Sequence, residues 1–280
     1  MLSGHELIPR PSVGFLPGYT AITEAAGSGA AVVPGLEIDF AVVKLRAGEV
    51  RAETHEHESV WVLLGGAAEI AFAGQTTTVR RASLFDEAPT ALHLGPGTPI
   101  TFRALTPETE WAVARTRNER RFPPRLYRPT DLAPEYRGAG LVQNACLRNV
   151  RLIFDRTTRP ESNFVLGEVI NYPGRWSSYP PHHHDQPEIY HYRFTAPNGY
   201  GHAELGEDVV KVRDGDTVVI PPGRDHAQVS APGYGMYYLW IIRHLPGNPY
   251  TGFTFAADHE WTLDAAQQGW RPADLPQGLA

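Results

Sequence analysis

The sequence predicts an all-β protein in which two small jelly-roll barrels follow one another. The 280 residues include 27 glycines and 25 prolines, which is many for a helical protein and ordinary for short strands joined by tight turns. A chain of this length can form two domains that each bury a core. A repeat supports two domains: Glu58 and Glu188 each begin an apolar segment, and Pro96-Gly97 and Pro222-Gly223 recur at a similar offset.

The first barrel is expected over residues 1–117. Residues 1–36 are rich in Gly, Pro and Ala with little periodicity, so we expect an irregular arm laid over the first sheet. Strand alternation begins after Leu36, and two apolar segments flank Gly65-Gly66 as in a hairpin. The expected strands lie within residues 38–44, 60–64, 68–72, 76–80, 91–94, 100–105 and 110–116.

A linker is expected over residues 118–140, where Arg, Pro, Asp and Gly replace periodic apolar residues. The second barrel should then occupy residues 141–280. Its expected strands lie within residues 150–154, 164–170, 188–194, 209–212, 217–220 and 236–242.

Composition and charge exclude several classes of function. A net charge of -6 offers no basic surplus for nucleic acid. The first residues lack a charged segment followed by an apolar one, and no apolar run approaches the roughly 20 residues that span a bilayer. Cys146 is the only cysteine, so we expect no intrachain disulfide and a cytoplasmic location. Sheet edges need cover, which favours a homo-oligomer.

A cluster of histidines and one glutamate predicts a metal site in the second barrel. His182 and His184 are two residues apart, so on a strand both imidazoles share one face, and Glu188 has the same parity. His226 follows a turn rich in glycine and proline that can aim it inward. Imidazole and carboxylate ligands with open positions suit a divalent ion, and these ligand types allow Mn, Fe, Zn, Co or Ni.

These two stretches resemble the two motifs of the cupin superfamily, His-x-His-x3-Glu and Gly-x5-Pro-x-Gly-x2-His. Further residues resemble the 5-deoxy-glucuronate isomerases, a bicupin family of inositol catabolism, although His183 stands where that family usually has lysine. The resemblance implies a metal-dependent conversion of 5-deoxy-D-glucuronate, a small sugar acid, to 5-dehydro-2-deoxy-D-gluconate. The segments that carry the resemblance are 176–182, 188–190, 237–239 and 258–261.

Tyrosines and arginines near the ligands are candidates for the remaining chemistry. An aldose–ketose interchange needs a proton carried between carbons and another exchanged between oxygens, and a substrate carboxylate needs a guanidinium. The expected catalytic residues are Tyr190, Tyr192 and Tyr238, with Tyr179 and Tyr237 as further candidates. The expected substrate-binding residues are Arg175 and Arg193, with Arg224 and Arg243 close in sequence.

The corresponding motif of the first barrel is broken. Ile100 stands where the pattern of His226 would require a histidine, and Glu58 directly follows His57 without a spacer. We therefore interpret His55, His57 and Glu58 as solvated loop residues and His93 as structural.

Three other functions remain open on the sequence. A related isomerase acts on 4-deoxy-5-keto-uronates from pectin and needs similar chemistry. A cupin dioxygenase would use the open metal positions for O2, and a non-catalytic module would only bind a sugar acid.

Overall fold

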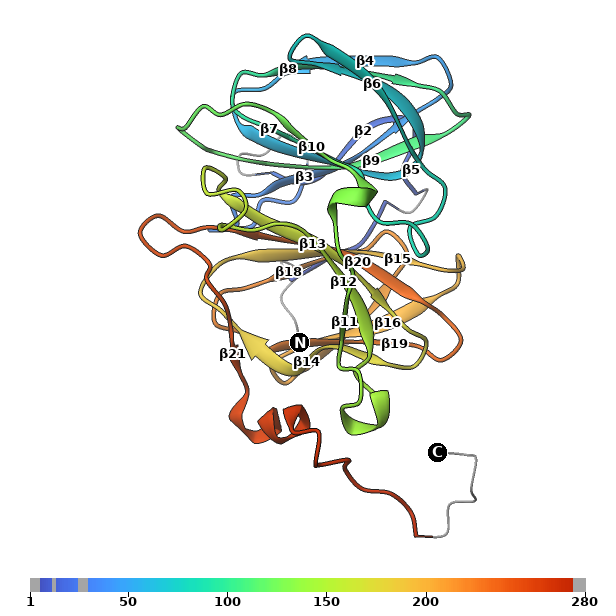
Figure 1. The fold of residues 1–280 in the computed structure, drawn as a ribbon, viewed down its shortest axis with the longest axis vertical. Helices are drawn as coiled ribbons and strands as arrows, with labels where there is room; N and C mark the ends of the chain where they lie inside the picture. Colours follow the sequence, from blue (N-terminus) through green and yellow to red (C-terminus); the bar gives the residue numbers. More distant parts are fainter. Residues whose placement is uncertain (1–5, 12–13, 25–29, 274–280) are drawn as a thin grey trace.

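The computed structural model describes residues 6–11, 14–24 and 30–273, and this part of the chain contains 21 β-strands and three short 3-10 helices. Figure 1 shows two β units stacked along the long axis of the molecule. The all-β prediction is confirmed. The strand pairings among the described residues leave open sheets with edge strands, so closure of each unit into a barrel stays a prediction.

The first unit is a nine-stranded arrangement built around the long strand β5. The first half of β5 pairs with β7 and β9, and its second half pairs with β6 and β8. At the bend, Gly66 has φ +90°, and a Cβ there would lie 2.4 Å from the Glu108 carbonyl oxygen, so only glycine fits. The strands are β2 (Gly18–Thr23), β3 (Asp39–Leu45), β4 (Val50–Thr54), β5 (Glu58–Phe72), β6 (Gln75–Arg81), β7 (Ala91–Leu94), β8 (Pro99–Ala104), β9 (Thr109–Thr116) and β10 (Arg125–Tyr127).

The second unit packs a seven-stranded sheet against a five-stranded one. The larger sheet has the order β1 (Leu7–Ile8), β18 (Thr217–Ile220), β15 (Glu188–Phe194), β20 (Met236–Arg243), β13 (Phe164–Asn171), β12 (Arg148–Phe154) and β11 (Glu135–Arg137). The smaller has the order β17 (Asp208–Arg213), β16 (Tyr200–Leu205), β19 (His226–Ser230), β14 (Trp176–His183) and β21 (Thr254–Phe255). The 3-10 helices are η1 (Pro129–Asp131), η2 (Val142–Asn144) and η3 (Ala257–Leu263).

The two units share an apolar core between their facing sheets. Val60 and Val62 of β5 enter it from the first unit, and Ile189 of β15 enters it from the second. Because side chains alternate along a strand, the neighbouring Trp61 packs inside the first unit and Tyr190 inside the second. Each of these strands is therefore buried on both faces.

A buried ionic cluster joins the units beside this core. The Glu168 carboxylate on β13 accepts a 2.6 Å hydrogen bond from Arg81 of the first unit and a 3.0 Å bond from Arg151 on β12. All three side chains are almost fully buried. The cluster fixes how the two units dock, because a buried charge that loses its partner is costly.

The expected course of the N-terminal segment needs correction, and the expected linker gains detail. Leu7–Ile8 pairs with β18 of the second unit instead of lying over the first sheet, because β18 leaves an edge that a strand can cover. The expected linker, 118–140, holds two short strands, of which β10 pairs with β7 and β11 with β12. In the described ranges, no helix has the length and apolar character to cross a membrane.

The buried cluster gives a stability prediction. Glu168→Gln leaves two guanidinium groups buried without their anion, so we expect a loss of roughly 3 kcal/mol or more in the free energy of unfolding. Glu69→Gln is the matched control, because Glu69 pairs with Arg103 in an exposed ion pair, and it should cost about 1 kcal/mol or less. Urea denaturation followed by circular dichroism measures both, and equal losses would contradict the account.

Candidate metal centre and its cavity

A cavity of about 440 Å³ lies inside the second unit. Its wall combines ligand-type side chains, tyrosines, arginines and apolar residues from both sheets and from the C-terminal segment. The residues that matter for the chemistry are His182, His184, Glu188, Tyr190, Tyr238, Arg137 and Arg148.

His184, Glu188 and His226 form one buried group, with a ligand atom of each within 4.8 Å of the others. Glu188 Oε2 lies 3.1 Å from His184 Nε2 and 3.4 Å from His226 Nε2. It is the only such group of three or more in the described part of the chain. Two imidazoles and one carboxylate are a donor set that fits a divalent transition ion.

Local structure aims these side chains at one another. Glu188 opens β15, and His226 opens β19 after the turn 221–225. Gly223 has φ +72° in this turn, and its amide donates a 2.8 Å hydrogen bond to the His184 carbonyl. His226 Nδ1 lies 3.1 Å from the Arg224 carbonyl, to which it donates. That bond leaves the lone pair of His226 Nε2 free for a cation, and this buried atom has no other hydrogen-bond partner.

His182 stands beside the group without joining it. It is the cross-strand neighbour of His226, and the two ring centroids are 4.4 Å apart. Its Nδ1 donates to the Ser178 carbonyl at 3.2 Å, which leaves its Nε2 as the available ligand atom. The role of His182 as a fourth ligand stays a prediction. His183 points elsewhere, and its Nδ1 lies 2.7 Å from the Asp225 carboxylate.

Burial dominates the electrostatics of these residues. It lowers the pKa of His182 to about 4 and that of His226 well below the usual value. It also raises the pKa of Glu188. Each shift disfavours the charged form of the side chain. A cation between them would favour the deprotonated carboxylate and the neutral imidazoles.

Two of the three expected catalytic tyrosines line the cavity. The Tyr238 hydroxyl lies 2.5 Å from Ser177 Oγ and 3.2 Å from Ser178 Oγ, and the Tyr190 hydroxyl lies 3.3 Å from Ser178 Oγ. Ser178 has φ +55°, a left-handed conformation that is uncommon for serine and is often found at functional sites. These four hydroxyl groups form one connected network.

The other tyrosine candidates have different surroundings. Tyr192 points into the second unit but does not line the cavity, and its hydroxyl donates a 2.5 Å bond to Gln228. Tyr237 faces the core that the two units share, on the other side of β20 from Tyr238. Tyr179 lines the cavity.

The structure does not place Arg175 or Arg193 at the cavity. Arg193 follows Tyr192 on β15 and therefore points to the opposite face, where it binds Glu110 of the first unit at 2.7 Å. The Arg175 guanidinium donates to the Asn144 carbonyl. Arg224 and Arg243 are likewise paired, with Glu6 and Glu37.

Two other arginines, Arg137 and Arg148, line the cavity. Arg148 could have been found from its spacing, because it lies two residues before Val150 on β12 and strand residues two apart share a face. That inference requires the knowledge that β12 borders the cavity, which the sequence alone does not give.

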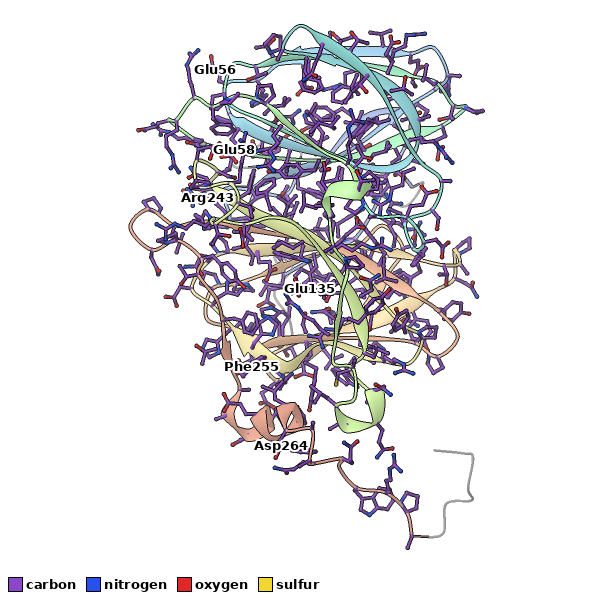
Figure 2. The ribbon with its side chains drawn as sticks, viewed as in Figure 1. Glu56, Glu58, Glu135, Arg243, Phe255 and Asp264 are labelled. Carbon is purple, nitrogen blue, oxygen red and sulfur yellow. The ribbon has the colours of Figure 1, made fainter. Side chains whose placement is uncertain are left out.

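The expectation of a solvated Glu58 is wrong. Glu58 is fully buried between the two units (Figure 2), where it binds His93 Nε2 and Asn118 Nδ2, each at 2.7 Å. The register of β5 turns Glu58 to the same side as Val60, toward the shared core. Glu188, in contrast, faces the interior of its own unit. His55 and His57 are half-buried, with ring centroids 5.1 Å apart.

The C-terminal segment forms part of the cavity wall. β21 adds to the edge of β14, and Phe255, which Figure 2 labels, is the cross-strand partner of His182. Phe253, Phe255, Thr262 and Leu263 all line the cavity. The segment around Trp261, whose role the sequence leaves open, therefore covers the cavity of its own chain.

Comparisons with known proteins point to one family. The model of the KduI/IolB family matches residues 26–262. A 5-deoxy-glucuronate isomerase from Geobacillus thermodenitrificans is 29% identical over 249 residues, which cover 81% of this chain and 87% of the relative.

Solved structures share the fold. An IolB-like protein from Salmonella typhimurium superposes with a TM-score of 0.79 at 25% identity and covers 92% of this chain and 99% of its own. Oxalate decarboxylase from Lactobacillus farciminis superposes with a TM-score of 0.66 at 11% identity, over 91% of this chain and 89% of its own, and shows the fold alone.

Metal content tests the group directly. We expect one divalent ion per chain, and His226→Ala should remove most of it because the ion loses one of three close ligands. His57→Ala should keep the wild-type content, since the first unit lacks a comparable group among its described residues. Elemental analysis after dialysis measures both. Two ions per chain, or full retention in His226→Ala, would overturn the assignment.

The metal-free protein should also lose stability in acid. His182 has a folded-state pKa of about 4, below the unfolded value of about 6.5, so the unfolded chain binds more protons between these values. The contribution of His182 to the free energy of unfolding is therefore fully present above pH 6.5 and declines as the pH falls toward 4. In chelator-treated protein, His182→Asn should flatten the fall of Tm between pH 7 and 5. If Tm falls with pH as steeply in His182→Asn as in the wild type, His182 is not the source of the acid sensitivity.

Proposed function

The chain belongs to the KduI/IolB family and is an isomerase, and we propose that it converts 5-deoxy-D-glucuronate to 5-dehydro-2-deoxy-D-gluconate in myo-inositol catabolism. The observation that carries this proposal is the buried group of His184, Glu188 and His226 beside a cavity that Ser178, Tyr190 and Tyr238 line. The relatives named 5-deoxy-glucuronate isomerase support the choice of substrate.

His184, Glu188 and His226 would hold the metal, with His182 as a fourth ligand. A divalent ion bound there would supply Lewis acidity to a carbonyl and its neighbouring hydroxyl. The ligands are buried, and the aromatic rings of Tyr250 and Phe253 pack on His184 and His182, which reduces the contact of these ligands with water.

Tyr190 and Tyr238 are assigned to proton exchange at the substrate oxygens. Burial raises the pKa of both phenols, so each hydroxyl stays protonated at neutral pH and can donate a hydrogen bond. Ser177 and Ser178 connect the two phenols, which gives a proton a path between neighbouring oxygens. Tyr192 is assigned no contact with the substrate, because it does not line the cavity and its hydroxyl donates to Gln228.

We also propose a cytoplasmic location and a homo-oligomer. Cys146 is the only thiol in the sequence, which suits a reducing compartment. The smaller sheet ends at β17, where Val209 is exposed, and an uncovered edge of this kind can pair with another copy.

The assignment of Tyr238 predicts a loss of turnover. Tyr238→Phe removes a hydroxyl from the network, so we expect kcat to fall roughly 100-fold or more with metal content unchanged. Tyr237→Phe is the matched control, since Tyr237 is the next residue on β20 but faces the shared core. The conversion is followed by NMR. If Tyr237→Phe loses as much activity as Tyr238→Phe, the role of Tyr238 is contradicted.

The reaction itself is tested in D2O. If the proton that moves between the two carbons exchanges with solvent on the way, deuterium should appear at the carbon that becomes the hydroxymethyl group of the ketose, less any proton that is transferred internally. No conversion of 5-deoxy-D-glucuronate would defeat the proposal. Turnover of a 4-deoxy-5-keto-uronate in its place would identify the related isomerase, and O2 consumption would identify an oxygenase.

A further inference from the structure

Arg148 is the half-buried cation of the cavity that has no carboxylate partner within the described residues. It opens β12 and lines the cavity. One of its donors, Nη1, bonds to the Cys146 carbonyl at 2.9 Å, and no other hydrogen bond of its guanidinium is seen in this part of the chain. Burial lowers the pKa of Arg148, the direction expected for a cation that is partly removed from water.

The other arginines near the site are already engaged. Arg137 also lines the cavity, but its guanidinium binds Glu135 at 2.8 Å. Arg193 binds Glu110, and Arg175 binds a backbone carbonyl. An enclosed guanidinium without an anion is costly, so Arg148 is the group for which an anionic ligand gives the largest electrostatic gain.

Arg148 lies on the cavity wall near the phenols of Tyr190 and Tyr238. The ring of Tyr190 lies 5.8 Å from that of His226 and 4.6 Å from that of Tyr238. Burial raises the pKa of Tyr238, and the nearby charge of Arg148 opposes that shift. From the metal group the wall thus passes Tyr190 and Tyr238, and Arg148 lines the same wall beside these phenols. A sugar acid has the same order of chemistry: a carbonyl end, hydroxyls and a carboxylate.

We propose that Arg148 binds the carboxylate of the substrate and thereby fixes which end of the sugar acid reaches the metal group. This inference rests on the proposed function, since it takes the substrate to be a six-carbon acid that reacts at its aldehyde end. A guanidinium can hold a carboxylate through two parallel hydrogen bonds. Arg148 is therefore the residue that selects acids over neutral aldoses.

Steady-state kinetics with two substrates test the selection. 5-Deoxyglucose replaces the carboxylate with a hydroxymethyl group and keeps the reacting end. The wild type should prefer the acid, and Arg148→Met should raise KM for the acid roughly 10- to 100-fold while it changes KM for 5-deoxyglucose little. Arg103→Met is the control and should change KM by about twofold or less, because Arg103 lies in an exposed ion pair of the first unit and does not line the cavity.

A binding measurement separates this inference from the isomerase proposal. The probe is the acid whose aldehyde has been reduced to an alcohol, which cannot isomerise, and its Kd is measured by calorimetry. Weaker binding to Arg148→Met, with wild-type metal content, supports the role of Arg148 even if no isomerisation is found. If Arg148→Met isomerises the acid with the wild-type KM and the wild-type preference for the acid, the role of Arg148 is overturned. The isomerase proposal would still stand.

A second variant guards against misfolding. Arg148→Lys keeps the charge but not the planar fork, so its Kd and KM for the acid should lie between those of the wild type and of Arg148→Met. If Arg148→Met does not fold, the same comparison uses Arg148→Lys. Wild-type KM and Kd in the lysine variant would then count against carboxylate binding through the guanidinium fork.

Discussion

The site depends on a sheet that is buried on both faces. In β15, β20 and β13, one set of side chains must pack on the first unit, as Ile189, Leu239 and Leu166 do. The alternate set, which includes Glu188, Tyr190 and Tyr238, then faces the cavity. Because strand residues alternate strictly, the packing that joins the two units (Figure 1) also orients the ligand and the phenols.

The same constraint explains why the two units differ. In the first unit tilted aromatic rings pack in the interior: the Phe102 ring centroid lies 4.3 Å from that of Trp61 and 5.0 Å from that of Trp111. Glu58 is turned outward into the contact between units, where it binds His93. Since aromatic rings occupy this interior and Glu58 faces away from it, the first unit serves as the support on which the functional sheet rests.

Spacing and parity in the sequence predicted the all-β class and the residues that gather as His184, Glu188 and His226, because those properties are local to a strand or a turn. They could not predict Arg148, whose relevance depends on which strand borders the cavity. Tyr192 was predicted as a catalytic residue because it shares the parity of Glu188. Its hydroxyl, however, donates a hydrogen bond to Gln228. Arg193 was assigned without regard to its parity, and the pairing of β1 with the second unit is a long-range contact that local pattern does not encode.

The central claim is that one cation binds to His184, Glu188 and His226 in the second unit. The substrate then lies in the cavity with its carbonyl end at the cation. Anomalous diffraction from crystals grown with Mn²⁺ and the reduced, unreactive acid tests it most directly. The account predicts one strong peak bonded to His184, Glu188 and His226, with the carboxylate of the acid beside Arg148. A peak at His55 and His57, or an acid bound in the opposite direction, would contradict it.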